Sequence, residues 1–429
     1  MYFDMCFSPE AVKDLADILG SLDVIELVTP KDFSLLKKDW LARESFSNPT
    51  FLYDTELLEK AMDKSELLLA AASRFSDSVY PETDADRVLY RILKKRVMDA
   101  NSTIVLASAI FHHDDRWAKK AVFERFDCPS EETLSEVSSV LRSGGNAKTL
   151  APDFSPSAVD WLKSDRSYLK DMSFNATEIA NNFQFVLDYY GIKGWNIRLD
   201  PNCAAINVSE KSSRGEKEII IPTTREVSGL KLLELIGHEL STHLRGFENA
   251  SCFFSEVLPS ELKPLTTIFA KSGSAVMNEG VAKFSDWSIS GDSALPTLYY
   301  CEAIRLALSG KSFAEVSEEI YRLKRNRKIK PESARRTTWD VVYRVFRGIS
   351  NTENLASYAF TKDAAYLIGW LDIVKMSKSF DVSAAEKTAV FDFCSLDREE
   401  VKKLLQVFPN LTPKYDRSVI PTVLSLLLL

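Results

Sequence analysis

The apolar positions in the first third of the chain recur at the three- and four-residue spacing of amphipathic helices. The clearest example is one apolar stripe, formed by Val88, Leu89, Ile92, Leu93 and Val97. A stripe of this kind packs one face of a helix against a hydrophobic core. We therefore expect residues 8–150 to be helical, with a similar helix over residues 56–75. Glycines at 144–145, followed by Pro152 and Pro156, predict a break near residue 150.

A change of period marks the centre of the chain. Residues 176–190 predict one more helix, and Gly191 follows it in the position of a C-cap. Trp195, Ile197 and Leu199 then alternate with polar residues, which is the pattern of a half-buried strand.

Two further strands are predicted at residues 204–208 and 218–221. The turn-forming residues 212–215 lie between them, so we interpret the pair as a hairpin. Ser228 is a suitable N-cap for the helix that follows. The apolar stripe of that helix comprises Leu232, Leu233, Ile236 and Leu240. From residue 259 onward the spacing again indicates mostly helices.

Composition places the chain among ordinary globular proteins. It has 429 residues, of which 45% are hydrophobic and 27% charged. This length allows two regions, which we place at residues 1–150 and 151–429. A net charge of −7 argues against a protein that coats nucleic acid. The predicted class is α+β, with a small mixed or antiparallel sheet inside a large helical surround.

Cysteine usage and the two ends of the chain bear on its location. The six cysteines are scattered and include no C-x-x-C pair, which is typical of reduced thiols in a cytoplasmic protein. The first residues lack the features of a signal peptide. The apolar run at residues 422–429 is too short to cross a bilayer, so we expect it to dock on the body of the protein, with no membrane span.

The most informative stretch is residues 238–243, which read HELSTH and contain two of the four histidines in the chain. It is a lengthened form of H-E-x-x-H, in which two imidazoles bind zinc and the glutamate activates water. In an α-helix, residues five apart lie about 140° from each other around the axis, against about 40° for residues four apart. Either a π-bulge returns His238 and His243 to one face, or the helix unwinds before His243 and ends near Gly246. Two core histidines with no metal are the simpler alternative.

A catalytic zinc site requires a third protein ligand, and we expect a downstream carboxylate. The best candidate is Glu279, because an Asn-Glu pair on a second helix resembles the arrangement in thermolysin-like zincins. Asp286 lies about two turns further on the same face and is a candidate to orient a ligand histidine. The alternative for residues 278–279 is helix capping. His112 and His113 are expected to have ordinary packing or solvent roles.

A second group of motifs lies near the C-terminus, at residues 343–348 (YRVFRG) and 360–369 (FTKDAAYLIG). Upstream of it, residues 322–336 contain eight basic side chains. They are Arg322, Lys324, Arg325, Arg327, Lys328, Lys330, Arg335 and Arg336. Such a run usually forms a solvated face, but it is also suited to attract an acidic peptide.

Several motifs together resemble one family much more specifically than any of them does alone. They are NPTFLY at 48–53, HELSTH at 238–243, NEGVA at 278–282, YRVFRG at 343–348 and FTKDAAYLIG at 360–369. The set resembles the MATCAP family, which joins eukaryotic tubulin tyrosine carboxypeptidases with bacterial QEGLA-motif proteins. The resemblance covers about residues 30 to 410. One departure is visible in the family's third-ligand motif, which usually reads Glu-Gly-Leu-Ala after a glutamine or a similar residue. Here Asn278 precedes the glutamate and Val281 stands in place of the leucine.

The resemblance implies roles for four residues in an α+β fold with a zincin-like metallopeptidase core. His238, His243 and Glu279 become the zinc ligands, and Glu239 becomes the general base that takes a proton from water and passes it to the leaving amine. The implied cofactor is therefore Zn²⁺. The implied reaction is removal of a C-terminal residue, with an aromatic residue as one candidate, from a peptide or protein tail.

A carboxypeptidase must also recognise the substrate's α-carboxylate, and a cation is the usual solution. Arg347 and Lys362 are the leading candidates and Arg344 is the third. Tyr366 is a candidate to donate a hydrogen bond to the oxyanion. An alternative for Lys362 is simple pairing with Asp363.

Two other functions remain open. One is an endopeptidase or aminopeptidase on the same scaffold, and the other is a peptide-binding protein without catalysis. In any of these, the strand at residues 218–221 is a candidate edge for an extended peptide.

Overall fold

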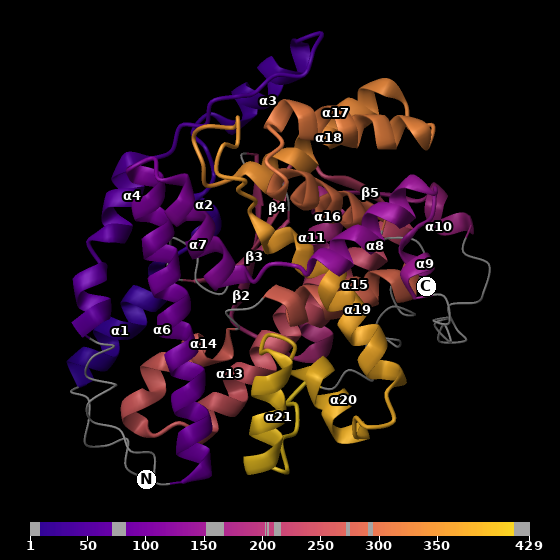
Figure 1. Cartoon of the computed structure of the whole chain (residues 1–429). Helices are drawn as coiled ribbons and strands as arrows, with labels where there is room; N and C mark the ends of the chain where they lie inside the picture. The colour runs from indigo at the N-terminus through magenta and orange to yellow at the C-terminus, as the bar shows by residue number, and fades with distance from the viewer. Residues whose placement is uncertain are drawn as a thin grey trace.

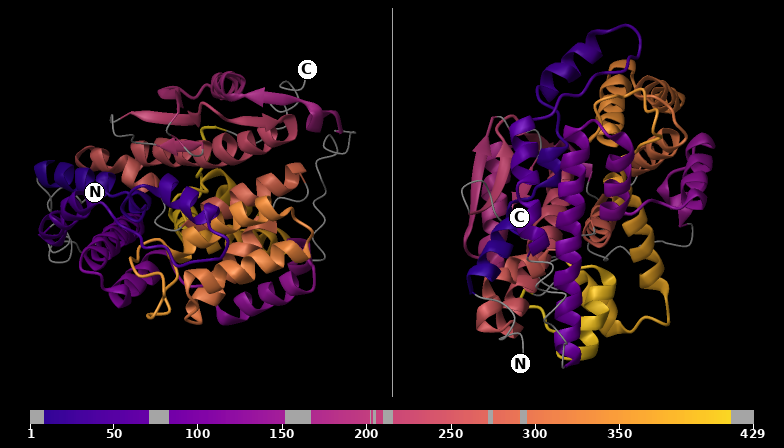
Figure 2. Two further views of the ribbon diagram at one scale, coloured as in Figure 1. Left: turned by 90° about the horizontal axis from the view of Figure 1, so that it is seen from above. Right: turned by 60° about the vertical axis from the view of Figure 1, so that its left-hand side comes forward.

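The structure is a computed structural model, which describes residues 9–70, 83–151, 167–201, 203, 206–209, 216–271, 275–290 and 295–415. Helices dominate the fold, while the strands gather on one side of the molecule (Figures 1 and 2). The α+β class and the mostly helical surround are confirmed. Among the described helices, none has both the length and the apolar character needed to cross a membrane.

The N-terminal part consists of helices, as predicted. Their bounds are α1 (Pro9–Ser21), α2 (Val24–Leu27), α3 (Phe33–Ala42), α4 (Thr55–Met62), α6 (Asp84–Phe111), α7 (Asp115–Phe126), α8 (Glu131–Arg142), α9 (Ala147–Leu150) and α10 (Ser167–Asp171). The predicted apolar stripe is buried on α6, which begins at a capping box between Thr83 and Asp86. The helix expected over 56–75 is interrupted: α4 ends at Met62 and helical structure resumes at residue 65, while 71–75 lie outside the described residues.

The strands form two small sheets. Their bounds are β1 (Ser173–Asn175), β2 (Trp195–Asp200), β3 (Asn207–Ser209), β4 (Lys217–Pro222) and β5 (Glu226–Ser228), with α11 (Ala176–Tyr190) between β1 and β2. β1 pairs with β5, and the larger sheet has the order β2-β4-β3. The predicted hairpin is confirmed, since β3 and β4 are antiparallel, although residues 204–205 and the turn at 212–215 lie outside the described residues.

One prediction about this sheet is wrong. The strand at 218–221 was expected to offer a free edge to an extended peptide. β4, which contains it, is instead the central strand, because β2 pairs with it in parallel on its other side. Its backbone hydrogen-bonding groups therefore face β2 and β3, and it has no open edge for an added strand.

The rest of the described chain is helical. The bounds are α12 (Gly229–Leu235), the π-helix η3 (Ile236–Leu244), α13 (Arg245–Val257), the 3₁₀ helix η4 (Ser260–Leu265), α14 (Thr266–Ala270), α15 (Ala275–Ser290), α16 (Leu295–Leu308), α17 (Phe313–Asn326), α18 (Pro331–Phe346), the 3₁₀ helix η5 (Thr361–Ala364), α19 (Ala365–Lys378), α20 (Ala384–Asp392) and α21 (Arg398–Val407). The apolar run at 422–429 lies outside the described residues.

Two buried clusters hold these helices together, and each joins early and late parts of the sequence. The first packs α1 and α6 against the sheet, α13 and α21. The second packs α4, α7 and α8 against α16, α17, α18 and α19. The boundary near residue 150 remains a prediction, and Pro152 and Pro156 lie outside the described residues.

The early NPTFLY segment at 48–53 docks on the chain that follows α18. Thr50 forms an isolated bridge with Asn351. The buried Tyr53 hydroxyl accepts a hydrogen bond from the Gly348 amide at 2.9 Å and donates one to the Ile349 carbonyl at 3.0 Å. Two motifs that lie about 300 positions apart in sequence thus form one structural unit.

Candidate metal centre

The two motif histidines lie on a single unbroken helical run. Ser228 caps its start by accepting a hydrogen bond from the Lys231 amide, as predicted. The run continues through α12, η3 and α13, and η3 spans nine residues as a π-helix. Of the two arrangements expected for the five-residue spacing, the π-helical one is present, and Gly246 lies inside α13 instead of ending the helix. As a result, the rings of His238 and His243 are 4.8 Å apart between centroids.

Glu279 completes the group from a different helix. It lies on α15, where its Oε2 is 3.8 Å from His238 Nε2 and 3.7 Å from His243 Nε2. Potential ligand atoms of all three residues lie within 4.8 Å of one another. Because α15 begins at Ala275, Glu279 sits beyond the first turn and does not cap the helix. The structure thus brings together the three residues that were predicted to be metal ligands.

The chemistry of these donors fits a bound cation. Glu279 Oε2 is buried, and no hydrogen bond to it is formed within the described residues. Burying a carboxylate oxygen without a hydrogen-bond donor or a cation beside it costs free energy of folding, so such oxygens are rare in native proteins. Two imidazole nitrogens and one carboxylate oxygen form a typical ligand set of catalytic zinc. A cation among these three side chains would satisfy the buried oxygen.

Asp286 orients the first histidine. Its Oδ2 lies 3.1 Å from His238 Nδ1, and Lys283 Nζ contacts the same oxygen at 2.6 Å. Burial raises the pKa of Asp286, but His238 and Lys283 outweigh this effect and bring it down to about 2. The carboxylate therefore stays ionised and accepts the Nδ1 proton, which leaves Nε2 free to face Glu279. This contact was predicted from the position of Asp286 on the helix, whereas the part played by Lys283 was not.

The predicted base lies beside the first histidine. Glu239 follows His238 on η3 and is half-buried. Burial lowers the pKa of His238, but the charges of Asp286 and Glu239 more than offset it, so this pKa is raised overall. The four residues of the predicted catalytic set are therefore clustered on η3 and α15. In contrast, His112 and His113 are exposed at the end of α6, and His113 contacts Ser350.

Two more predicted residues approach the cluster from η5 and α19. Lys362 Nζ lies 4.0 Å from Glu279 Oε1. Tyr366 is half-buried, and burial together with the charges of Glu279 and Asp363 raises the pKa of its phenol well above the usual range. The phenol therefore stays protonated at neutral pH and can donate a hydrogen bond.

Arg344 and Arg347 share a partner that the sequence did not reveal. Arg344 Nη1 lies 3.1 Å from one Asp363 oxygen, and Arg347 Nη2 lies 3.0 Å from the other. Asp363 is buried, and its pKa stays low because the two guanidinium groups outweigh the effect of burial. Asp363 thus binds the end of α18 and not simply its neighbour Lys362. Arg344 is still 38% exposed, while Arg347 is only 7% exposed.

The basic run at 322–336 is partly structural. Lys324 is buried and donates to Thr337 Oγ1. Arg327 donates to the carbonyl of Gly145, and Arg335 donates to the carbonyls of residues that follow α3. Arg325, Lys328, Lys330 and Arg336 remain exposed, as does Arg322.

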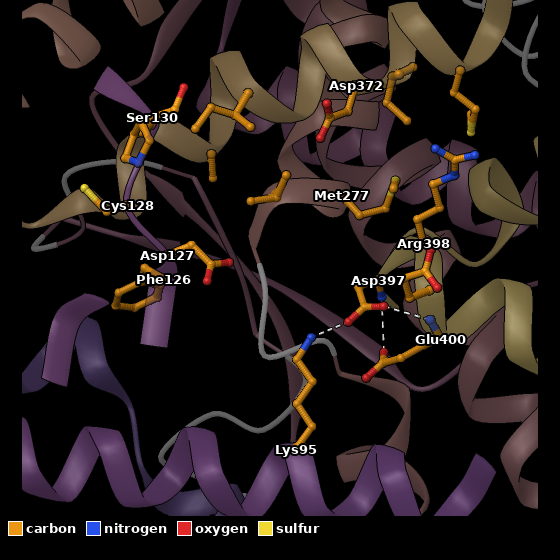
Figure 3. A pocket seen from close by; sticks show the side chains of 18 of the residues that line it. Lys95, Phe126, Asp127, Cys128, Ser130, Met277, Asp372, Asp397, Arg398 and Glu400 are labelled. Atoms are coloured by element: carbon orange, nitrogen blue, oxygen red, sulfur yellow. Dashed lines mark hydrogen bonds and ion pairs between the residues drawn. The ribbon is translucent and has the colours of Figure 1, made fainter. Parts of the chain in front are cut away.

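A cavity of about 760 Å³ is lined in part by residues of α15, the helix that carries Glu279, and of α19 (Figure 3). Met277 of α15 and Asp372 of α19 face it, and Lys95 pairs with Asp397 at its wall. None of its lining residues is one of the three candidate ligands. The cavity and the candidate centre thus share α15 but use different residues of it.

Comparison with known proteins gives one family match. A sequence model of the family described as "Microtubule-associated tyrosine carboxypeptidase" (MATCAP) matches residues 125–392. No curated protein matches the chain.

Two solved structures show a weak overall likeness. A candidate lipoprotein from Colwellia psychrerythraea has 10% identity and a TM-score of 0.37, covering 88% of this chain and 71% of its own. Metallocarboxypeptidase 1 from Trypanosoma cruzi has 13% identity and a TM-score of 0.28, covering 97% of this chain and 95% of its own. Because the family match spans more than half of the sequence and contains every residue of the candidate centre, the chain belongs to the MATCAP family.

Proposed function

We propose that this protein is a zinc-dependent carboxypeptidase that removes the C-terminal residue of a peptide or protein. The observation that carries the proposal is the meeting of His238, His243 and Glu279, in which the buried Glu279 Oε2 lies near both imidazoles and accepts no hydrogen bond from the described residues. Membership of the MATCAP family supports a peptidase of this general kind. The scattered cysteines favour the cytoplasm, and an acidic tail on the substrate would suit the exposed part of the basic run.

The proposed chemistry divides the work among a few residues. His238, His243 and Glu279 would hold the zinc, which when bound supplies Lewis acidity that makes water a nucleophile near neutral pH and polarises a carbonyl. Glu239 would accept the proton from the attacking water and deliver it to the leaving amine. Asp286 keeps the Nδ1 of His238 protonated, so the orientation of that ring is fixed before substrate arrives.

Substrate recognition would use the residues of η5, α18 and α19. We propose that Lys362 binds the α-carboxylate, because its ammonium group reaches the cluster and is held by no short hydrogen bond among the described residues. Arg344 is the second candidate, since more than a third of its side chain is exposed. Arg347 would act indirectly by fixing Asp363. The neutral phenol of Tyr366 would donate a hydrogen bond to the developing oxyanion.

The test compares one peptide in two forms, with a free C-terminal carboxylate and with a C-terminal amide. The proposal predicts cleavage of the free acid only, and loss of activity with retention of zinc in Glu239→Gln. Lys362→Ala should raise KM for the free acid about tenfold or more, because a charge-assisted contact contributes about 1.5–3 kcal/mol. Lys13→Ala is the matched control, since Lys13 is exposed on α1 and lies outside both the site motifs and the basic run.

Other outcomes would identify a different function. Equal cleavage of both forms would indicate an endopeptidase, and dependence on a free amino terminus would indicate an aminopeptidase. Peptide binding without any cleavage by the zinc-loaded wild type would indicate a non-catalytic binding protein.

A further inference from the structure

The helix that carries both histidines contains the long π-helical segment η3, which other contacts must stabilise against relaxation to an α-helix. Most π-helical segments are single turns, whereas η3 covers nine residues. If η3 relaxed to a regular α-helix, residues 238 and 243 would lie about 140° apart around its axis and would no longer face the same point. The arrangement of the candidate centre therefore depends on whatever keeps η3 in its π form.

Arg245, the first residue of α13, contacts the backbone of η3 in two ways. Its backbone amide bonds to the carbonyl of Leu240, five residues earlier, as a π-helix requires. Its side chain Nε donates to the carbonyl of Ser241, four residues earlier, at 2.9 Å. Arg245 thus donates a hydrogen bond to the Leu240 carbonyl, which is its partner in a π-helix, and another to the Ser241 carbonyl, which would be its backbone partner in an α-helix.

The guanidinium group of Arg245 is anchored to a different part of the chain. Nη1 lies 2.7 Å from the carboxylate of Asp392 and 3.1 Å from the carbonyl of Tyr415, and Nη2 donates to the carbonyl of Phe391 at 3.0 Å. Arg245 and Asp392 are both almost completely buried, with side-chain exposures of 1% and 3%. Charged side chains are rarely buried to this extent unless they are paired.

The residues after Asp392 provide a second support behind His243. The thiol of Cys394 contacts the carbonyl of Thr242 at 3.4 Å, and the Ser395 hydroxyl donates to the carbonyl of Gly246 at 3.1 Å. The approach is so close that a methyl group at Gly246 would lie 2.6 Å from the Cys394 sulfur. The segment at 391–395 therefore binds the carbonyls on both sides of His243.

We propose that Arg245, held by Asp392, is a positioning residue for the candidate metal centre. It keeps η3 in the π-helical form that directs His243 toward His238 and Glu279, and it does so without touching metal or substrate. This inference rests on the proposed metal-binding function. Beyond that function, it states that the buried Arg245–Asp392 ion pair, which does not touch the metal, determines how tightly the site binds zinc.

The test measures zinc affinity by competition with a chelator, in purified protein whose fold is checked by circular dichroism and thermal unfolding. Arg245→Lys keeps the positive charge beside Asp392 but loses the planar group that reaches Ser241 and Phe391 together. Asp392→Asn keeps the shape but removes the charge that anchors Arg245. Each variant should bind zinc about tenfold to a hundredfold more weakly than wild type, as expected when support for a metal ligand is lost.

Glu400→Gln is the matched control, since it disrupts another buried pair, Arg96–Glu400, which contacts none of the three ligands. It should lower the unfolding temperature and leave zinc affinity unchanged. The inference is overturned if Arg245→Lys and Asp392→Asn both bind zinc as wild type does, or if the control loses affinity to the same extent. If Arg245→Lys does not fold, Asp392→Asn decides alone. If the wild type binds no zinc, the proposed metal site itself is refuted. If the wild type and both variants bind zinc equally, only the positioning role of Arg245 is refuted.

Discussion

Gly280 and Gly369 meet where α15 crosses α19, and neither position has room for a side chain. A methyl group on Gly280 would lie 2.4 Å from the carbonyl carbon of Gly369, and one on Gly369 would lie 1.9 Å from the carbonyl oxygen of Val276. The two helices therefore touch backbone to backbone. This contact lets Glu279 on α15 and Lys362, just before α19, approach to 4.0 Å.

Substituting Gly369 by alanine should separate the two helices. The added methyl group meets backbone atoms that cannot rotate away, so we expect a loss of at least about 3 kcal/mol in the free energy of unfolding. Chemical denaturation measures this loss. Lys375→Ala is the control, because Lys375 is exposed on the same helix, and it should cost less than about 0.5 kcal/mol. Equal losses in the two variants would contradict a backbone contact as the cause.

A buried ion pair connects the N-terminal helices to the C-terminal end of the fold. Arg96 of α6 forms two hydrogen bonds with Glu400 of α21, at 2.8 and 2.9 Å. Glu400→Ala should destabilise the protein by about 3–5 kcal/mol, because it leaves a buried guanidinium without its partner. The exposed pair Lys60–Glu56 provides the comparison, and Glu56→Ala should cost less than about 1 kcal/mol. A small effect of Glu400→Ala on denaturation would show that the Arg96–Glu400 pair contributes little to holding the two parts together.

Tyr53 should contribute measurably through its hydroxyl group. Tyr53→Phe leaves the buried Gly348 amide and Ile349 carbonyl without this partner, which should cost about 1–3 kcal/mol. Tyr189 is 41% exposed, so Tyr189→Phe should change stability by less than about 0.5 kcal/mol. Thermal unfolding of both variants makes the comparison, and a neutral Tyr53→Phe would show that the Tyr53 hydroxyl is not needed to hold the NPTFLY segment.

Lys324 gives the protein a pH-dependent stability. Burial lowers the pKa of Lys324 to about 7, whereas an unfolded lysine titrates near pH 10.4. Between these values the unfolded chain binds more protons, so stability rises with pH. From pH 7 to pH 9 this one group should add about 2 kcal/mol to the free energy of unfolding of wild type.

The check is denaturation at pH 7 and pH 9. Lys324→Met should lack this increment, while Lys328→Met should keep it, because Lys328 is exposed. An identical pH dependence in wild type and Lys324→Met would contradict the assignment.

The sequence predicted more of the candidate centre than of the surrounding fold. The five-residue spacing of His238 and His243 predicted a strained helix because the angle between the two positions follows from helix geometry alone. The proposed role of Glu279 followed from the third ligand that a catalytic zinc site requires and from the resemblance of its Asn-Glu pair to that of thermolysin-like zincins. Both inferences concern short segments, in which local geometry leaves few alternatives.

The predictions that failed or stayed incomplete involve partners that are distant in the sequence. The hairpin of β3 and β4 was predictable from its turn, but the parallel pairing of β2 with β4 depends on a crossover that has no local signal. In the same way, the one partner considered for Asp363 was Lys362, its neighbour in the chain, yet Asp363 pairs with two arginines at the end of α18. The ion pair between Arg245 and Asp392 could not be predicted, because the two residues lie 147 positions apart and no local pattern connects them.

The most direct test of the proposed metal centre is the zinc content of purified protein, measured by elemental analysis after dialysis. We expect about one zinc per chain in wild type and almost none in His243→Ala or Glu279→Ala. His113→Ala should retain the wild-type amount, since His113 is exposed at the end of α6 and lies outside the cluster. Unchanged zinc in His243→Ala, or no zinc in wild type, would contradict the assignment of this centre.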